Sequence, residues 1–295
     1  MARLMDGMDW RALLMGLAFA LMWSSAFTSA RMIVADAPPL YALSLRFLVS
    51  GLIGVAIARA LGQSWHLTRG QWRAVVLFGI SQNALYLGLN FVAMQTIEAS
   101  LAAIIASTMP LLVALAGWLV FRERLRPLGV AGLVMGFVGV AVIMGARLGG
   151  GVDLFGVMLC VLGVISLTLA TLSVRGASGA GGNLLMIVGL QMLVGSLILI
   201  GPAVVLEVPE VTWTWRLVGA FSYTVLVPGL AATWVWFLLV GRIGAVRAAS
   251  FHFLNPFFGV AVAALLLGES LGLFDVLGVL VIMAGILAVQ KARLI

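Results

Sequence analysis

The sequence predicts an all-α integral membrane protein with ten transmembrane helices in two inverted five-helix repeats. Three observations predict it: the composition, ten long apolar segments and an internal duplication. Of the 295 residues, 63% are hydrophobic and 9% are charged, whereas an ordinary soluble domain is about 25% charged. A soluble fold has too little interior for this much apolar surface, so lipid must be the solvent. The composition therefore excludes a soluble enzyme or a nucleic-acid binder, even at a net charge of +7.

Ten apolar segments are long enough to cross a bilayer, which takes about 20 helical residues. Turn and charge signals separate them, among them Pro38-Pro39, the charged run 122–127 and the glycine-rich run 176–182. The segments are apolar on all sides, whereas a β-barrel needs short strands that alternate apolar and polar residues. The predicted spans are roughly 11–30, 40–60, 72–94, 98–120, 127–146, 152–174, 183–206, 214–240, 244–266 and 271–290.

The basic residues predict the orientation, because cytoplasmic loops of membrane proteins collect Lys and Arg. If the N-terminus is inside, three basic residues fall outside (Arg31, Arg147 and Arg216) and Arg46 falls within a span. We therefore expect a multi-pass protein of the plasma (inner) membrane with both termini in the cytoplasm. The remaining basic residues then lie on the cytoplasmic side: Arg3, Arg11, Arg59, Arg69, Arg73, Arg122, Arg124, Arg126, Arg175, Arg242, Arg247, Lys291 and Arg293.

The two halves of the chain share landmarks at an offset of 143 to 146 residues. Because each copy holds an odd number of spans, the second must enter the membrane upside down, as in secondary transporters with a site near the midplane. We expect the repeats at 1–146 and 147–295. Cleavage of the first span as a signal peptide would leave the sixth span unmatched, so we expect it to be retained. The matched landmarks are Asp9 with Asp153, Arg31 with Arg175, Leu45 with Leu190, Trp72 with Trp215, Pro110 with Pro256, Glu123 with Glu269, Gly132 with Gly278, and Gly139 with Gly285.

Several of these landmarks resemble the EamA domain of the drug/metabolite transporter (DMT) superfamily. Residues 21–31 resemble its opening, and the segments 102–123 and 248–269 resemble its fourth helix, each with a proline thirteen residues before the glutamate. Within the superfamily the chain is similar to amino-acid exporters, including the YddG-type exporters of aromatic amino acids. It departs from the pattern at Glu98, where a small residue is more usual, and at Gln191, which replaces Arg46 in the second copy.

Arg46 is the basic residue predicted well inside a span, where a lipid-facing charge costs about 2.5–3.5 kcal/mol. It lies roughly 9 Å below the outer end of the second span, at 1.5 Å per residue. Two interpretations are open. In the first, the side chain extends outward and meets Asp36 or Glu98. In the second, it attracts a substrate carboxylate, and replacement by Lys would then abolish transport.

Polar and aromatic residues within the spans are the other candidates for substrate binding. Asn83, Tyr86 and Asn90 follow the spacing i, i+3 and i+7 of one α-helical face. Adjacent aromatic and amide surfaces suit a ligand with an apolar body and a polar head, which favours amino acids with aromatic or large apolar side chains. Interhelical hydrogen bonding is the alternative explanation for each residue. The remaining candidates are Trp23, Ser24, Trp234, Trp236, His252 and Asn255.

Two further groups concern motion and coupling. Pro110 and Pro256 lie mid-helix at matched positions, where each removes a backbone hydrogen bond. They are either static packing kinks or hinges that bend during transport. Glu98 and His252 are candidates for proton coupling, although an acid at a helix N-terminus is favoured by the helix dipole alone. The spacing of Gly132 and Gly136 predicts close helix packing, within the chain or with a partner.

These features predict a secondary transporter that exports amino acids or similar small metabolites by alternating access. The alternative is a broader drug/metabolite efflux carrier, and a channel or an intramembrane enzyme is a further one. The sequence has no Walker A motif, no His-Glu-x-x-His and no Gly-x-Ser-x-Gly. We expect no cofactor, metal or nucleic acid, and the single cysteine, Cys160, allows no intrachain disulfide. The expected partners are the bilayer and a small-molecule substrate.

Overall fold

The computed structural model describes residues 9–120, 122, 126–173 and 183–294, and every regular element in these ranges is a helix. Ten helical segments are long and apolar enough to span a membrane, as the sequence predicts. The spans are Trp10–Val34, Pro39–Ala60, Arg69–Ala93, Ala99–Leu119, Pro127–Arg147, Leu154–Leu172, Leu184–Leu206, Trp215–Ile243, Arg247–Leu267 and Leu273–Ala292.

Six of the spans are single helices and four are broken into shorter elements. The unbroken ones are α1 (Trp10–Val34), α2 (Pro39–Ala60), α7 (Pro127–Gly149), α8 (Leu154–Ser173), α9 (Leu184–Leu206) and α14 (Leu273–Leu294). The broken ones are the third span, α3 (Arg69–Phe78), η2 (Gly79–Leu87) and α4 (Gly88–Ala93); the fourth, α5 (Ala99–Ala106) and α6 (Met109–Leu119); the eighth, α10 (Trp215–Thr224), η3 (Val225–Ala231) and α11 (Ala232–Ile243); and the ninth, α12 (Ala245–Ser250), η4 (Phe251–Leu254) and α13 (Asn255–Leu267).

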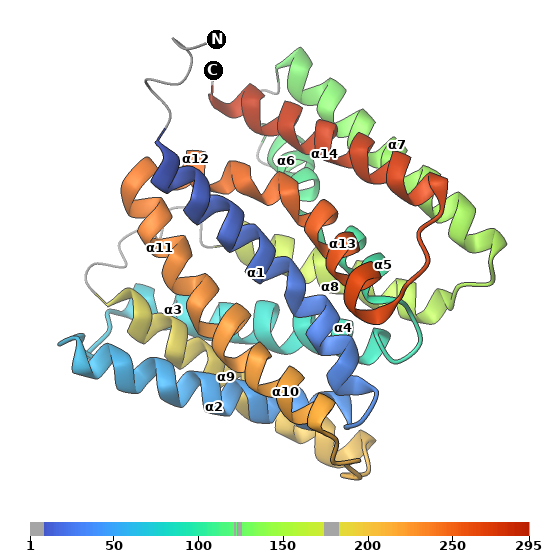
Figure 1. Ribbon diagram of the computed structural model, residues 1–295. Coiled ribbons are helices and arrows are strands. Elements are labelled where there is room, and N and C mark those ends of the chain that lie inside the picture. The colour runs from blue at the N-terminus through green and yellow to red at the C-terminus, as the bar shows by residue number, and fades with distance from the viewer. Residues whose placement is uncertain (1–8, 121, 123–125, 174–182, 295) are drawn as a thin grey trace.

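Both described ends of the chain lie at the same end of the bundle, because ten successive crossings return the chain to its starting face (Figure 1). We call this the terminal face. The opposite face, which we call the far face, is formed by the connections 35–38, 94–98, 150–153, 207–214 and 268–272.

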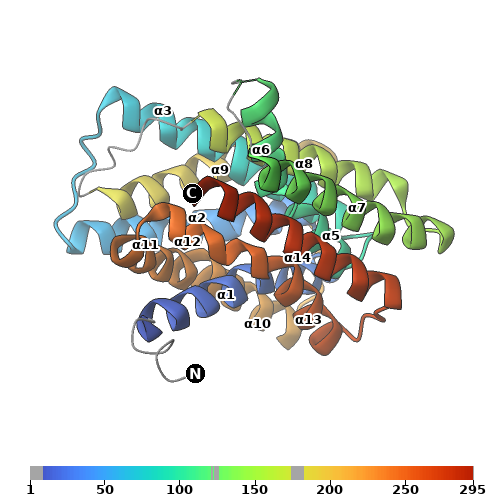
Figure 2. The ribbon, with the colours of Figure 1, turned by 90° about the horizontal axis from the view of Figure 1, so that it is seen from above.

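The two halves interlock rather than lying side by side. The first helix of each half packs on the third and fourth spans of the other half: α1 contacts α10, α11 and α13, and α8 contacts η2, α4, α5 and α6. Two further pairs join equivalent helices, α2 with α9 along one side of the bundle and α7 with α14 along another (Figures 1 and 2). The fold is therefore an inverted repeat in which neither half buries its helices without the other.

Glycines explain how closely α7 and α14 approach. A Cβ atom on Gly132 would lie 2.7 Å from the carbonyl oxygen of Gly285, and one on Gly139 would lie 2.8 Å from that of Gly278. Gly136 faces the Leu111 side chain instead. The close packing predicted from the glycine spacing thus occurs within the chain, between the two halves.

The broken spans occur at matched positions in the two copies. The third and eighth spans both contain a π-helical segment, η2 and η3, and Pro228 lies inside η3. The fourth and ninth spans are both interrupted just before a proline, Pro110 at the start of α6 and Pro256 at the start of α13. π and 3₁₀ segments inside helices are frequent at functional sites and hinges, so the breaks mark the region where a site is expected.

Candidate functional site

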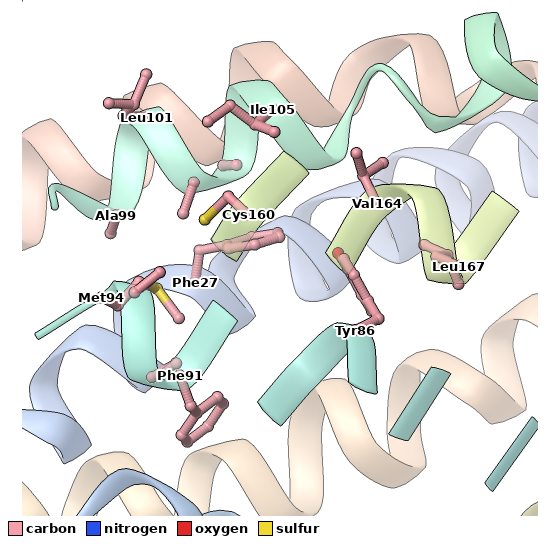
Figure 3. Packing of buried hydrophobic residues seen from close by; sticks show 14 of the residues in the cluster. Phe27, Tyr86, Phe91, Met94, Ala99, Leu101, Ile105, Cys160, Val164 and Leu167 are labelled. Carbon is pink, nitrogen blue, oxygen red and sulfur yellow. The ribbon is translucent and has the colours of Figure 1, made fainter. Parts of the chain in front are cut away.

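A small cavity lies among α1, α2, the third span and the eighth span, and we call it the central cavity. Its volume is about 40 Å³, which holds a few water molecules and is far below the roughly 300–1,000 Å³ of small-molecule sites. Figure 3 shows Phe27, Tyr86, Phe91 and Met94 of its wall within the buried apolar core. The lining residues are Trp23, Ala26, Phe27, Ala30, Arg46, Tyr86, Leu87, Asn90, Phe91, Met94, Thr224 and Pro228.

Arg46 is the one charged residue among those that line this cavity. Its side chain is buried, with 5% of the residue exposed, and its Nε has no hydrogen-bond partner among the described residues. Its Cζ lies 4.9 Å from the centroid of the Phe47 ring. Burying an unpaired cation is costly, so the guanidinium requires water or an anion from the cavity.

Both acids that the first interpretation of Arg46 requires are engaged elsewhere. Asp36 accepts a hydrogen bond from Thr214 Oγ1 (2.8 Å) and pairs with Arg216 (3.1 Å). The Thr214 hydroxyl, followed by the Arg216 guanidinium, holds the pKa of Asp36 below its usual value. Glu98 pairs with Arg147. The outward ion pair of the first interpretation is therefore not formed among the described residues: the two acids lie at the far face, while Arg46 lies about two turns along α2 and lines the cavity.

The stripe predicted for the third span is divided between two surroundings. Tyr86 and Asn90 line the cavity, whereas Asn83 Nδ2 donates to the carbonyl oxygen of Gln191 on α9 at 2.9 Å. The cause is the π-helical segment η2, whose i→i+5 hydrogen bonds change the angle per residue and break the α-helical spacing. The Asn90 amide donates to the Tyr86 carbonyl (2.8 Å) and accepts from Cys160 Sγ (3.3 Å), so it is satisfied within the protein.

Aromatic rings separate the central cavity from the terminal face. Phe19 contacts Trp23 at 5.8 Å between centroids, Trp236 at 4.7 Å and His252 at 5.2 Å, and Trp236 lies 5.3 Å from His252. The Asn255 amide contacts His252 Nδ1 at 3.0 Å. We call these five residues the aromatic cluster. Trp23 belongs both to the cluster and to the cavity wall, so the two form one continuous region.

Three residues that the sequence suggested as functional do not line the central cavity: Trp234, Ser24 and Glu98. Trp234 is 56% exposed on the outside of the bundle, because residues two apart on a helix point to nearly opposite sides and Trp236 faces inward. Ser24 is buried, and its hydroxyl has no partner among the described residues. Glu98 lies at the far face, where Arg147 also binds Asp275 at 3.0 Å.

The two proline positions lie where the broken spans meet. α5 packs against α13, and a Cβ atom on Gly259 would touch Ala103. Before Pro110, the hydroxyls of Ser107 and Thr108 donate to the carbonyls of Ile104 and Ile105 at 2.7 Å. These bonds satisfy backbone groups that lipid cannot, so the interruption is stable in the membrane interior.

Sequence reasoning missed eight residues of the cavity wall: Ala26, Phe27, Ala30, Leu87, Phe91, Met94, Thr224 and Pro228. The apolar ones carry no signal against a background of similar residues. Pro228 did carry a signal, since a proline inside a predicted span marks an irregular helix. Among the described residues, no group of three or more His, Cys, Asp or Glu is placed to hold a metal ion.

Matched contacts close both faces of the molecule. Glu207 accepts from the backbone of Leu40 (2.8 Å) and Tyr41 (3.0 Å) at the far face, and the equivalent Gln63 accepts from Met186 (3.0 Å) at the terminal face. Asp9 pairs with Arg242, and the equivalent Asp153 bonds to Thr96. At the far face Glu269 also accepts from the backbone of Ala99 and Ser100. Its partner in the repeat, Glu123, lies outside the described residues, as does Arg175.

A bundle of ten spans in two inverted repeats, with an interior cavity that contains a buried arginine, is an architecture that recurs among membrane transporters. The comparison with known families is specific. A model of the EamA-like transporter family matches residues 10–145 and, separately, residues 154–290. The chain belongs to the EamA-like transporter family.

Three similar proteins are named as transporters or exporters. The chain is 29% identical over 277 residues to the uncharacterized transporter YvbV of Bacillus subtilis (strain 168), covering 93% of this chain and 90% of YvbV. It is 27% identical over 271 residues to the uncharacterized inner membrane transporter YedA of Escherichia coli (strain K12), covering 88% and 83%. The aromatic amino acid exporter YddG of Ancylobacter novellus is 34% identical over 139 residues, which is 47% of this chain and 48% of YddG.

A solved crystal structure shares the fold, with a TM-score of 0.70 at 20% identity, covering 96% of this chain and 97% of the other. Together the family and the ten spans identify a multi-pass membrane transporter.

Proposed function

We propose that this transporter exports amino acids, with a preference for aromatic or large apolar side chains, by alternating access. The observation that carries the proposal is the unpaired Arg46 guanidinium facing a cavity lined with aromatic rings. A guanidinium binds a carboxylate through two parallel hydrogen bonds. The rings of Trp23, Phe27 and Phe91 offer the matching apolar surface. The YddG relative is an exporter of aromatic amino acids, which supports the same substrate class.

The charges of the cavity wall also favour a zwitterion over a cation. The lining residues include Arg46 and no acid, so a cationic drug would meet repulsion without a counter-charge. The ammonium group of an amino acid can instead contact the hydroxyl oxygen of Thr224 and the faces of the neighbouring rings.

Transport requires the central cavity to widen, since its present volume of about 40 Å³ does not hold an amino acid. We assign the bending to the breaks before Pro110 and Pro256 and to the π-helical segments η2 and η3. Opening toward the terminal face requires the aromatic cluster to separate. Of the two candidates for proton coupling, we assign the role to His252, which lies in that cluster. Glu98 is instead held in an ion pair at the far face.

We also propose which face of the molecule lies in the cytoplasm and where the two repeats divide. The terminal face is assigned to the cytoplasm, because ten of the described basic residues lie at or near that end of the bundle, against Arg31, Arg147 and Arg216 at the far face. The two separate family matches support a repeat boundary between residues 146 and 147. Attachment of a membrane-impermeant reagent to a cysteine introduced at exposed Arg69, in intact cells, tests the orientation: no labelling is expected before lysis.

The test of the substrate class is counterflow in proteoliposomes loaded with unlabelled compound. We expect saturable uptake of labelled phenylalanine and tryptophan that is accelerated by the same compound inside, and no accelerated uptake of a lipophilic cation. Uptake that rises linearly without counterflow would identify a channel. Saturable exchange of cationic drugs without amino acids would identify a broader efflux carrier and overturn the proposal.

A further inference from the structure

A second and larger pocket opens on the side of the bundle, between α2 and α10 at the far face. Its volume is about 460 Å³, against about 40 Å³ for the central cavity, and the two share no lining residue. Leu45 and Leu48 of α2 form one wall, Val218 and Phe221 of α10 the other, and Ile200 of α9 lies between them. We call this pocket the lateral groove.

The lateral groove faces hydrocarbon rather than water. Leu45, Leu48 and Val218 are 52%, 43% and 40% exposed on the membrane-spanning surface. Leu48 lies nine residues after the start of α2, or about 13 Å into the bilayer at 1.5 Å per residue. An apolar groove open at this depth loses contacts unless hydrocarbon fills it. The acyl chains of the surrounding lipids are the hydrocarbon that the bilayer supplies there.

At the rim of the groove, near the far face, two exposed residues of opposite charge adjoin lining residues in the chain: Arg216 precedes Leu217, and Glu210 precedes Val211. The Arg216 side chain is 56% exposed; its Nε and Nη2 bond to Asp36, so Nη1 is left for another acceptor. Glu210 lies between the rim residues Pro209 and Val211, and its exposed carboxylate has no partner among the described residues. The exposed Trp213 ring stands at the same rim, as expected at a headgroup boundary.

We propose that the lateral groove binds a zwitterionic phospholipid of the bilayer, with one acyl chain between α2 and α10, its phosphate at Arg216 and its ethanolamine ammonium at Glu210. An anionic headgroup fits less well, because acids outnumber the three arginines on this face. The described acids of the far face are Asp36, Glu98, Asp153, Glu207, Glu210, Glu269 and Asp275.

The groove bears on transport because its two walls also carry cavity residues. Arg46 follows Leu45 on α2, and Thr224 lies one turn after Phe221 at the end of α10. α2 contacts the eighth span mainly through η3, beyond the groove. A chain seated between α2 and α10 therefore sets the separation of two walls of the central cavity. The binding proposal itself does not depend on which substrate is carried.

Native mass spectrometry of the purified full-length protein tests the binding. The protein is extracted from nanodiscs containing equal amounts of phosphatidylethanolamine and phosphatidylglycerol. We expect one retained phosphatidylethanolamine on the wild type, and retention about tenfold lower in Ser222→Trp, equivalent to about 1.4 kcal/mol. Ser222 lines the groove and is exposed, so the indole fills the groove without entering the core.

Two matched variants complete the test. Leu226→Trp adds the same ring to the eighth span at a residue that is 53% exposed and outside the groove, so retention is expected to match the wild type. Glu210→Gln is expected to reduce the preference for phosphatidylethanolamine over phosphatidylglycerol. If Ser222→Trp does not fold, Leu45→Trp fills the groove from the α2 side and decides the question. Equal retention in the groove-filled and control variants, or no preference in the wild type, would overturn the proposal.

Discussion

The two copies of the repeat have the same backbone plan and differ in what lies beside their second helices. In the first copy Arg46 faces the central cavity next to Pro228 of the eighth span. In the second copy Gln191 stands at the position of Arg46, and α9 packs against η2 of the third span. There Asn83 donates to the Gln191 carbonyl at 2.9 Å, and its side chain packs against Gly195.

An internally duplicated chain can therefore contain a site that is present in one copy and absent from the equivalent place in the other. Duplication supplies the inverted scaffold, the π-helical segments and the proline breaks in both copies. The side chains differ, so that a cavity with a buried arginine lies beside one second helix, while a side-chain hydrogen bond joins the helices beside the other. Substitutions at equivalent positions should therefore have equal effects where the copies agree and unequal effects where they differ.

The largest expected difference is between Arg46 and its equivalent, Gln191. Arg46→Gln should lower kcat/KM for phenylalanine by about 100-fold, or about 2.7 kcal/mol, because a charge-assisted hydrogen-bond pair is lost. Arg46→Lys should restore a small part, since an ammonium cannot bind a carboxylate through two parallel bonds. Gln191→Ala should stay near wild type. Proteoliposome initial rates measure all three, and equal losses at the two positions would contradict the comparison.

The next effect concerns glycines at which the copies agree. Gly132→Val and Gly278→Val should each destabilise the protein by about 2–3 kcal/mol, because both side chains collide with the backbone of the partner helix. Gly145→Val on the same α7 helix meets nothing within 4 Å and serves as the control. Thermal unfolding in detergent measures the three. A clearly smaller loss at one of the two colliding positions would show that α7 and α14 do not pack symmetrically.

Asn83 should act on stability and Tyr86 on substrate binding, although both belong to η2. Asn83→Ala removes the bond to Gln191 and should cost about 1–2 kcal/mol of stability, with the KM of the remaining folded protein unchanged. Tyr86→Ala should raise KM instead, because the ring lines the cavity. Parallel unfolding and counterflow measurements separate the two effects, and a raised KM in Asn83→Ala would place that side chain at the site.

The smallest expected effect is a pH dependence of the two equivalent aspartates. The hydrogen bond from Arg242 lowers the pKa of Asp9 below 3.8, and that from Thr96 lowers the pKa of Asp153. Because both folded pKa values are depressed, their contribution to stability is present above pH 3.8 and is lost as the pH falls below it.

Salt distinguishes the two aspartates, since only the Asp9 partner is charged. The contribution of Asp9 should weaken with added salt, and that of Asp153 should not. Unfolding of Asp9→Asn and Asp153→Asn between pH 3 and pH 6, at low and high salt, measures this. An equal response to salt would show that the Asp9–Arg242 pair is not formed in solution.

The sequence predicted the features that depend on length and backbone chemistry. The ten spans follow from runs of about 20 apolar residues. The interruptions at Pro110 and Pro256 follow from the missing N–H of proline. The inverted repeat follows from matched landmarks and an odd number of spans in each half.

Features that depend on contacts between residues far apart in the chain could not be predicted from the sequence. The face of Asn83 was predicted from an α-helical spacing that η2 does not follow. Arg46 has no carboxylate partner, because Asp36 pairs with Arg216 and Glu98 pairs with Arg147. No local sequence pattern indicates which arginine each acid will bind. The prediction that both Trp234 and Trp236 bind substrate could have been avoided, because residues at i and i+2 of a helix point to nearly opposite sides.

The central claim, that Arg46 binds the substrate carboxylate, is tested most directly by competition with a ligand that lacks it. Phenylalanine and phenylalaninamide are compared as inhibitors of labelled phenylalanine counterflow, in the wild type and in Arg46→Gln. We expect the amide to inhibit the wild type about 100-fold more weakly than the acid. We expect Arg46→Gln, at raised protein density, scarcely to distinguish the two compounds. Equal inhibition of the wild type by both compounds would contradict it.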